Sequence, residues 1–203
     1  MTAEHFNWHE FLAQWSRTLL TDEEIKADVL DLLPAGTADA EWLGYTGASE
    51  EQIARAEARL GTVLPPSYRA FLLVSNGWHR LTYYIYSLWL VEEIDWFSAR
   101  NQEAIDDWME NRYLVADEEY FVYGEGQHET SFRHEYLQTA LQISDWSDSA
   151  VCLLNPQVVS ADGEWEAWFF AAWMEGARRY RSFYDMIRGE CHLFLEDRAN
   201  RPA

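Results

Sequence analysis

The 203 residues include 35 acidic and 15 basic side chains, which gives a formal net charge of −20 at pH 7. This charge disfavours direct binding to DNA or RNA, because nucleic-acid affinity depends on cations that displace counterions from the phosphates. Apolar residues make up 48% and charged residues 25%, and no apolar stretch approaches the roughly 18 residues of a membrane span, so disordered and membrane-spanning chains are both excluded.

The N-terminal region is expected to contain two helices. Apolar side chains recur every three or four positions over residues 5–20, which places on one face Trp8, Phe11, Leu12, Trp15 and Leu19. Thr21 and Glu24 form a capping box for a second helix, which Pro34 ends. We therefore predict an N-terminal helical extension over residues 1–46.

The next two helices have clear local boundaries. Ser49 and Gln52 form a second capping box, and Gly61 stands where a left-handed residue commonly ends a helix. Leu64-Pro65-Pro66 opens a further helix, because proline is tolerated in the first turn, where its missing N–H would have no partner. Asn76-Gly77 is expected to end that helix.

Strands are expected mainly in the second half of the chain. Aromatic and branched side chains favour a strand over 81–90, and apolar runs favour strands over 139–144, 150–154 and 164–173. The last of these follows the turn signal Asp162-Gly163 and is apolar enough to be buried on both faces. Residues 91–112 are ambiguous, although Ile105, Trp108 and Met109 have helical spacing.

A closing helix is expected over residues 182–197. Ser182 is a suitable N-cap, and Asp185 in the first turn complements the helix dipole. Helices at both ends with strands between them indicate an α+β fold, with a single antiparallel or mixed sheet flanked by helices.

Half of the charge excess lies in residues 92–135, the acidic segment, which holds 13 acidic and three basic residues. Aromatic residues are interleaved with these acids. The combination suits a protein-binding surface, where aromatic side chains supply contact area and charge steers the encounter. The alternative is that the aromatic residues face the core and the acids are simply solvated. The predicted partner-binding residues are Glu92, Glu93, Asp95, Asp106, Asp107, Glu110, Asp117, Glu118 and Glu119.

Candidate metal and nucleophile sites are weak. His5 and His9 share a helical face but lack an HExxH frame, whereas His128 and His134 lie six positions apart and converge only if a loop brings them together. Gly124-Glu125-Gly126 lacks the further glycine of a nucleotide loop, and no GxSxG motif is present. We expect no catalytic residue, no cofactor and no metal; a metal-dependent hydrolase built on His128 and His134 is the least favoured alternative.

Two features indicate the compartment. The first ten residues lack the basic and apolar regions of a secretory signal, and only Cys152 and Cys191 are available for disulfide formation. We therefore expect a reduced, cytoplasmic protein.

Residues 47–78 resemble the signature of the SUKH superfamily, which contains fungal cell-wall assembly regulators (Smi-Knr-like) and many bacterial toxin-immunity proteins. The C-terminal block is similar too, including a Gly-Glu-Trp-Glu-Ala-Trp run at 163–168. Matching residues with expected structural roles are Gly61, Leu64, Pro65, Tyr68, Asn76, Gly77, Trp78, Gly163, Glu164, Trp165, Trp168, Ser182 and Phe183. The resemblance implies a compact α+β domain over residues 47–203 and brings no catalytic residues with it.

The resemblance and the charge together predict a non-enzymatic protein that binds a basic protein partner. The leading hypothesis is an immunity protein that neutralises a cognate toxin, such as a nuclease, through the acidic segment. The alternative is a regulatory scaffold of the cell-wall assembly type. No contact with nucleic acid or membrane is expected, and the sequence leaves the oligomeric state open.

Overall fold

The computed structural model describes residues 6–23, 25–27, 41–110, 112–146 and 149–201. In chain order, the elements are α1 (Trp8–Leu20), α4 (Glu50–Leu60), α5 (Pro66–Val74), β1 (Trp78–His79), β2 (Ser87–Leu88), β3 (Asp95–Trp96), α6 (Ser98–Glu110), α7 (Asp117–Tyr120), the 3₁₀ turns η2 (Gly124–Gly126) and η3 (His134–Thr139), β4 (Leu141–Gln142), β5 (Ala150–Val159), β6 (Trp165–Ala171), β7 (Ala177–Tyr180) and α8 (Phe183–Asn200).

The strands form an antiparallel five-stranded sheet and a separate two-stranded ribbon. The large sheet has the order β3-β4-β5-β6-β7, and β1 pairs with β2. A single bridge between Leu88 and Ser144 joins the ribbon to the chain just after β4. The α+β class with an N-terminal helix is thus confirmed, with the ribbon as an addition to the one sheet that was expected.

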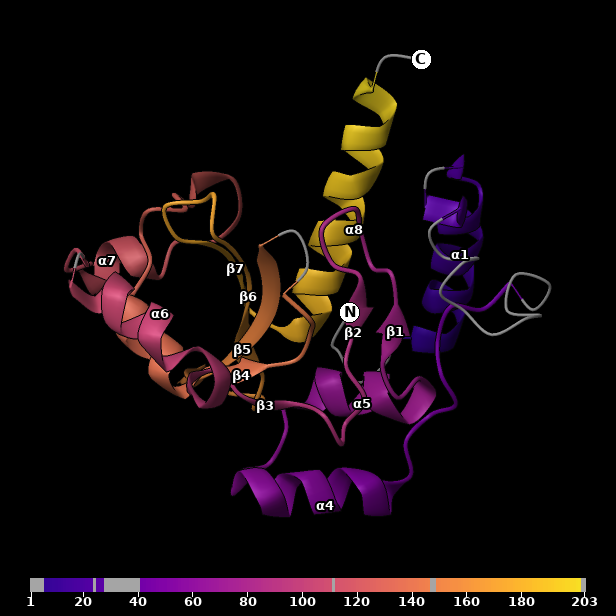
Figure 1. The fold of residues 1–203 in the computed structure, drawn as a ribbon, viewed down its shortest axis with the longest axis horizontal. Helices are drawn as coiled ribbons and strands as arrows, with labels where there is room; N and C mark the ends of the chain where they lie inside the picture. Colours follow the sequence, from indigo (N-terminus) through magenta and orange to yellow (C-terminus); the bar gives the residue numbers. More distant parts are fainter. Residues whose placement is uncertain (1–5, 24, 28–40, 111, 147–148, 202–203) are drawn as a thin grey trace.

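The five-stranded sheet separates two apolar cores. Successive residues of a strand point to opposite faces, and all seven residues of β6 are buried. Trp165, Ala167 and Phe169 pack into the core beneath α4, α5 and α8, whereas Trp168 and Phe170 pack into the core beneath α6 and η3. Figure 1 shows α6 and α7 on one side of the sheet and α8 on the other.

Helix α1 contributes to the larger core. Trp8, Leu12, Trp15 and Leu19 are buried in the same cluster as side chains from α5 and α8. The Trp15 indole N–H also donates to the Leu81 carbonyl oxygen at 3.1 Å. The division into a 1–46 extension and a 47–203 domain stays a prediction.

The local helix signals were largely correct. Both hydrogen bonds of the Ser49–Gln52 capping box are present, Gly61 adopts a left-handed conformation with φ of 71°, and the Ser182 hydroxyl accepts from the Asp185 N–H. The predicted cap at Thr21 is wrong. Thr21 ends α1, and Asp22 Oδ1 accepts the Ile25 N–H at 3.1 Å; Glu24 and residues 28–33 of the predicted second helix lie outside the described residues.

The predicted strand over 81–90 is wrong for most of its length. Arg80 has a φ of 48°, and the Thr82 hydroxyl accepts from the N–H groups of Tyr84 and Ile85. These local bonds form a turn between β1 and β2, in place of a sheet ladder. The aromatic and branched residues of this stretch are there because parts of it are buried: Leu81 and Ile85 belong to the core.

The other strands differ from expectation mainly in length. β4 covers only two residues of the predicted strand 139–144, because η3 extends to Thr139. β5 continues beyond residue 154 to Val159, and β6 lies within the predicted range. β7 was not predicted, because two of its four residues are arginines and arginines are not typical of a strand in the core. Ion pairs with Glu190 and Glu166 allow these arginines to pack there.

Within the described residues, no helix combines the length and apolarity that crossing a bilayer requires.

Candidate protein-binding surface

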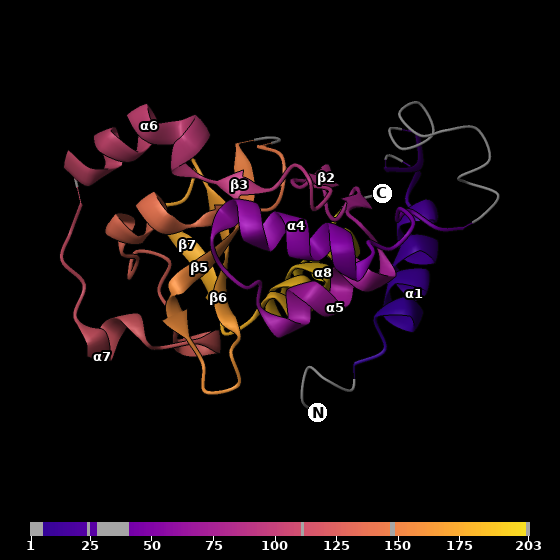
Figure 2. The ribbon, with the colours of Figure 1, turned by 90° about the horizontal axis from the view of Figure 1, so that it is seen from below.

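The central part of the acidic segment is a strap, residues 112–127, that joins α6 to the edge of the sheet. It contains α7 and η2. Figure 2 shows the connection from α6 to α7 along the outer edge of the molecule, on the face of the sheet opposite α8. The strap is built mostly from loops and short turns, so side chains must hold it in place. Four sets of contacts, centred on Glu166, Arg179, Gln127 and Arg133, do so.

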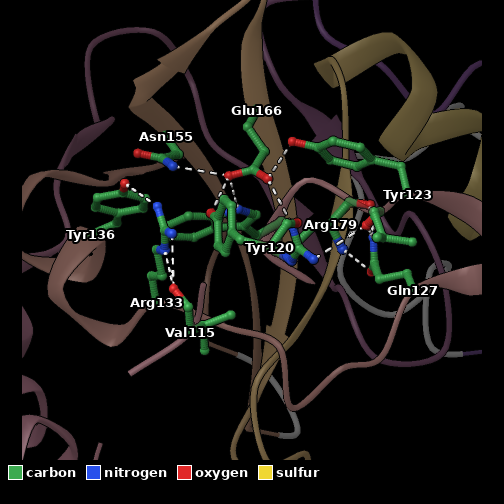
Figure 3. Close-up of polar contacts among 11 residues, drawn as sticks. Val115, Tyr120, Tyr123, Gln127, Arg133, Tyr136, Asn155, Glu166 and Arg179 are labelled. Carbon is green, nitrogen blue, oxygen red and sulfur yellow. Dashed lines mark hydrogen bonds and ion pairs between the residues drawn. The ribbon is translucent and has the colours of Figure 1, made fainter. Parts of the chain in front are cut away.

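The first set converges on Glu166 in β6. Its carboxylate is 1% exposed and accepts five hydrogen bonds. The donors are the hydroxyls of Tyr120 (2.6 Å) and Tyr123 (2.8 Å), Asn155 Nδ2 (3.0 Å), Trp168 Nε1 (2.8 Å) and Arg179 Nη1 (3.3 Å) (Figure 3). Tyr120 and Tyr123 belong to the strap, and the other three donors lie on the sheet. Glu166 therefore joins the strap to three neighbouring strands.

Burial and the charge on Glu166 both act on the two tyrosines. Burial, and then the nearby carboxylate, raise the pKa of Tyr120 and of Tyr123 well above the usual value for tyrosine. Both phenols therefore remain protonated and serve as hydrogen-bond donors. The Glu166 carboxylate already accepts hydrogen bonds from five donors, so it has no free lone pair facing a substrate. It supports the fold and is not placed to act as a general base.

Arg179 in β7 connects the sheet to the backbone of the strap. Its side chain is fully buried beside Glu166, Nη1 also donates to the Tyr120 carbonyl oxygen, and Nη2 donates to the Val122 carbonyl oxygen at 3.3 Å. The guanidinium carbon lies 4.2 Å from the centre of the Tyr120 ring. A buried arginine with this pairing fixes the C-terminal end of α7 and the residues after it against the sheet.

Gln127 closes the free edge of β7. Its side-chain amide donates to the Arg179 carbonyl oxygen at 2.8 Å and accepts the Arg179 N–H at 2.7 Å. The amide thereby makes the two bonds that another strand would make. Covering an edge in this way prevents unwanted strand pairing and also fixes the end of the strap.

Arg133 holds the beginning of the strap. Its Nε and Nη2 donate to the Val115 carbonyl oxygen at 3.1 and 2.8 Å, Nη2 pairs with the Asp117 carboxylate, and Nη1 donates to the Tyr136 hydroxyl at 3.0 Å. The guanidinium also lies over the Tyr120 ring. Figure 3 shows Arg133 between Val115 and Tyr136. Like Arg100 and Arg112, which bond to the Glu93 and Met109 carbonyl oxygens, Arg133 is used inside the acidic segment.

The outward side of the strap carries apolar residues among acids. The exposed fractions are 82% for Tyr113, 89% for Leu114, 47% for Phe121 and 36% for Val122. Nothing in the sequence marks Leu114, Phe121 or Val122 as exposed. The sequence shows two consecutive apolar residues, Tyr113 and Leu114, in a charged stretch. That pattern does not show whether the two residues are buried or exposed.

The three predicted acids nearest the start of the segment are engaged locally. Glu92 accepts from Gln52 Nε2 at 2.7 Å and from Asn76 Nδ2 at 3.1 Å. Glu93 accepts the Leu90 N–H, and Asp95 accepts the Trp96 N–H. Glu92 thus links α4 to Asn76, whereas Glu93 and Asp95 bond to the backbone of residues near them in the chain. These bonds involve no residue of the strap.

The other six predicted acids are all exposed and lie on the same side of the sheet. They belong to α6 (Asp106, Asp107 and Glu110) and α7 (Asp117, Glu118 and Glu119). Asp117 pairs with Arg133, and Glu119 accepts from the Ser131 hydroxyl at 2.6 Å. Helices α6 and α7 thus carry these acids at the two ends of the connection that holds Tyr113 and Leu114 (Figure 2).

The residues of the resemblance lie mostly in the interior or at element boundaries. Glu164 accepts from the N–H and the hydroxyl of Ser67 at 2.8 and 2.6 Å, and so caps α5, where Pro65 makes no side-chain cap. Asn76 Oδ1 accepts the Val91 N–H at 2.8 Å. The remaining side chains in the core, each at most 7% exposed, are Leu64, Tyr68, Trp78, Trp165, Trp168 and Phe183.

Glycines of the same set occupy positions that a side chain would disturb. Gly77 has a φ of 95°, and a Cβ there would lie 2.9 Å from the Leu88 carbonyl oxygen. Gly163 has a φ of 84° in the turn between β5 and β6. Both positions therefore favour glycine for backbone reasons.

The candidate metal ligands do not converge. In the described part of the chain, no group of three or more His, Cys, Asp or Glu side chains could hold a metal ion. His128 is exposed, and burial lowers the pKa of the half-buried His134. His9 stacks on Trp42, whereas His5 lies outside the described residues. Gly124–Gly126 forms the η2 turn.

Both cysteines are free thiols in the core. Burial raises the pKa of each thiol well above its usual value, which disfavours the reactive thiolate.

Glu92 gives a prediction for pH dependence. Partial burial alone would raise its pKa, but hydrogen bonds from Asn76 and Gln52 outweigh that effect and lower it. The folded state therefore favours the ionised form, and the resulting stability is present above the unfolded-state pKa of about 4.3 and lost as pH falls through the folded-state pKa. Glu92→Gln should cost less than about 1 kcal/mol at pH 7, because the carboxylate is exposed to solvent.

Urea unfolding of the wild type and Glu92→Gln between pH 3 and pH 7 tests this expectation. The difference in free energy of unfolding should shrink toward pH 3. Glu118→Gln, which removes an exposed carboxylate on α7, is the matched control and should show little difference at any pH. A gap between wild type and Glu92→Gln that stays constant over the whole range would contradict the assignment.

Comparison with known proteins supports the resemblance. A search of curated proteins gave no match. Residues 47–189 match the SMI1 / KNR4 family (SUKH-1), and this match includes α4, the sheets, the strap and the first part of α8. The matched region covers well over half of the chain, and the chain therefore belongs to the SMI1 / KNR4 (SUKH-1) family.

Proposed function

We propose that this chain is a non-enzymatic immunity protein of the cytoplasm that binds a basic bacterial toxin and blocks it by occlusion. Membership of the SUKH-1 family supports a protein-binding domain of this kind. The observation that carries the proposal is the outward surface of α6, the strap and α7. There, exposed acids of α6 and α7 flank exposed apolar side chains of a strap that buried contacts hold in place.

The support matters because binding is stronger when the surface is already ordered. Glu166, Arg179 and Arg133 fix the strap through bonds to both side chains and backbone. Little conformational entropy is then lost when a partner docks. The acids of α6 and α7 attract lysine and arginine on the partner and accelerate encounter. If the toxin is a nuclease, these carboxylates stand in for the substrate phosphates.

The test is co-expression of this chain with the gene adjacent to its own. Cells should survive expression of the toxin only when this chain is present, and the two purified proteins should form a stoichiometric complex. The association rate should fall steeply with salt, because the exposed acids act over distances that ions screen. Complex formation without rescue would indicate the scaffold function instead, and association that is independent of salt would contradict the electrostatic mechanism.

Matched charge variants localise the effect. Neutralising four acids of the proposed surface (Asp106→Asn, Asp107→Asn, Glu110→Gln and Glu118→Gln) should lower the association rate at low salt by at least about tenfold. The control neutralises four exposed acids on other elements (Glu51→Gln, Glu175→Gln, Glu196→Gln and Asp197→Asn). Both variants change the net charge equally. An equal loss of rate in the two variants would show that overall charge, and not this surface, drives association.

A further inference from the structure

The most exposed apolar side chains of the protein are adjacent to each other. Tyr113 and Leu114, the apolar pair, are 82% and 89% exposed, more than any other large apolar residue in the described part of the chain. Isolated exposed apolar residues are common, but these two are consecutive, in a strap whose Tyr120, Tyr123 and Gln127 side chains are bonded to the sheet. The pair therefore exposes apolar area that the fold itself does not use.

The backbone on both sides of the apolar pair is fixed. On the N-terminal side, Arg112 Nη1 donates to the Met109 carbonyl oxygen at 2.7 Å and covers the end of α6. On the C-terminal side, Arg133 holds the Val115 carbonyl oxygen with two bonds and pairs with Asp117. The two side chains are therefore presented from an ordered base, in contrast to a free loop tip.

The charges around the apolar pair define its partner. Glu110 precedes Tyr113 by three residues, and Glu118 follows Leu114 by four. A fully extended chain would therefore separate the Cα atoms of these pairs by at most about 11 and 14 Å. Arg112, the basic residue beside the pair, is turned back onto α6. An apolar pair with acids before and after it is complementary to an apolar pocket bordered by lysine and arginine.

We infer that Tyr113 and Leu114 insert together into an apolar pocket of the basic partner and carry most of the binding energy. This inference rests on the proposed function and deepens it, because it separates two roles on one surface. The acids of α6 and α7 set the association rate, whereas the apolar pair sets the dissociation rate. Buried anchors near the centre of an interface commonly dominate affinity, and truncation of such anchors acts mainly on dissociation.

The probe is the protein encoded by the adjacent gene, inactivated in its catalytic centre, with kinetics measured by surface plasmon resonance. Tyr113→Ala/Leu114→Ala should speed dissociation by at least about 30-fold and leave the salt dependence of association unchanged. The matched control, Val63→Ala/Leu73→Ala, truncates two exposed apolar residues (71% and 41%), one in the loop before α5 and one within α5, and should dissociate at the wild-type rate. Circular dichroism spectra of both variants should match the wild type, because the removed side chains are exposed.

Three results would overturn the inference in distinguishable ways. If wild type binds with a salt-dependent rate but the apolar-pair variant dissociates no faster than the control, the anchor assignment fails and the proposed function stands. If the wild type itself forms no complex with the probe, the proposed function is wrong, and so is the proposed anchoring role of Tyr113 and Leu114. If sedimentation shows a dimer of this chain that Tyr113→Ala/Leu114→Ala converts to a monomer, a second copy covers the pair.

Discussion

Glu166→Ala is expected to lower the free energy of unfolding by about 3–5 kcal/mol, because it leaves the buried Arg179 guanidinium without its counter-ion. The change also removes the acceptor for four other donors, including the Tyr120 and Tyr123 hydroxyls of the strap. A domain of this size is stable by only about 5–15 kcal/mol, so the loss is a large fraction of the total. Urea unfolding followed by tryptophan fluorescence measures it directly.

Two further variants test whether the loss of stability comes from leaving the Arg179 charge unpaired or simply from removing a glutamate side chain. Glu119→Ala is the matched control, since that exposed carboxylate accepts one hydrogen bond, from Ser131, and its removal should cost less than about 1 kcal/mol. Glu166→Met/Arg179→Met removes both buried charges and should be more stable than Glu166→Ala alone. If the double variant is no more stable than the single one, an uncompensated charge is not the cause of the loss.

Loss of Glu166 should also loosen the strap more than the rest of the protein. In a Glu166→Gln variant that remains folded, hydrogen exchange of amides in residues 115–127 should accelerate, whereas exchange in α4 and α5 should change little. The reason is that both tyrosine bonds and the Arg179 pairing meet at this carboxylate. Uniform acceleration over the whole chain would instead indicate global destabilisation.

Trp15→Ala is expected to destabilise the protein by about 3–5 kcal/mol, although Trp15 lies outside the region that matches the family. Its ring is 4% exposed, its centre lies 5.3 Å from that of Phe194 in α8, and its N–H donates to the Leu81 carbonyl oxygen. Removing it leaves a cavity between α1 and α8. The single unfolding transition should move to lower urea concentration as a whole.

The control for this prediction is Trp173→Ala, which removes an indole that is 53% exposed and should cost less than about 1 kcal/mol. Trp15→Phe should cost an intermediate amount, because most of the apolar volume remains while the Leu81 carbonyl oxygen loses its donor. If Trp15→Ala leaves the main transition unchanged, α1 is an independent extension. A shift of the whole transition shows that α1 is part of the folded unit.

The sequence by itself determined the elements whose signals are local. The Ser49–Gln52 capping box, the left-handed Gly61 and the Ser182 cap each depend on groups within a few residues of one another. The apolar run of β6 likewise predicted a central strand. Such features can be recognised because backbone geometry and short-range hydrogen bonding decide them before the rest of the chain is considered.

The secondary structure suggested by local composition was wrong where side chains supplied other hydrogen bonds or ion pairs. Residues 81–86 have the composition of a strand, but Arg80 and the Thr82 hydroxyl impose a turn there. The charged residues of β7 do not suggest a strand, yet Arg178 pairs with the buried Glu190 of α8, and Arg179 pairs with Glu166. Burial of an arginine depends on a partner that is distant in sequence, so composition alone does not predict it.

The candidate surface was decided by the tertiary structure. The sequence located the acidic segment, but Glu92 bonds to Gln52 of α4, and Glu93 and Asp95 bond to nearby backbone N–H groups. The acids of α6 and α7, by contrast, precede and follow the apolar pair along the chain. The strap is held by contacts between residues 46 to 59 positions apart, from Tyr120 to Glu166 and from Arg179 to Tyr120. Composition alone favoured the hypothesis of a basic partner. Only the tertiary structure decided how the strap is held and which of its side chains are exposed, because hydrogen bonds between residues so far apart leave no periodic trace in the chain.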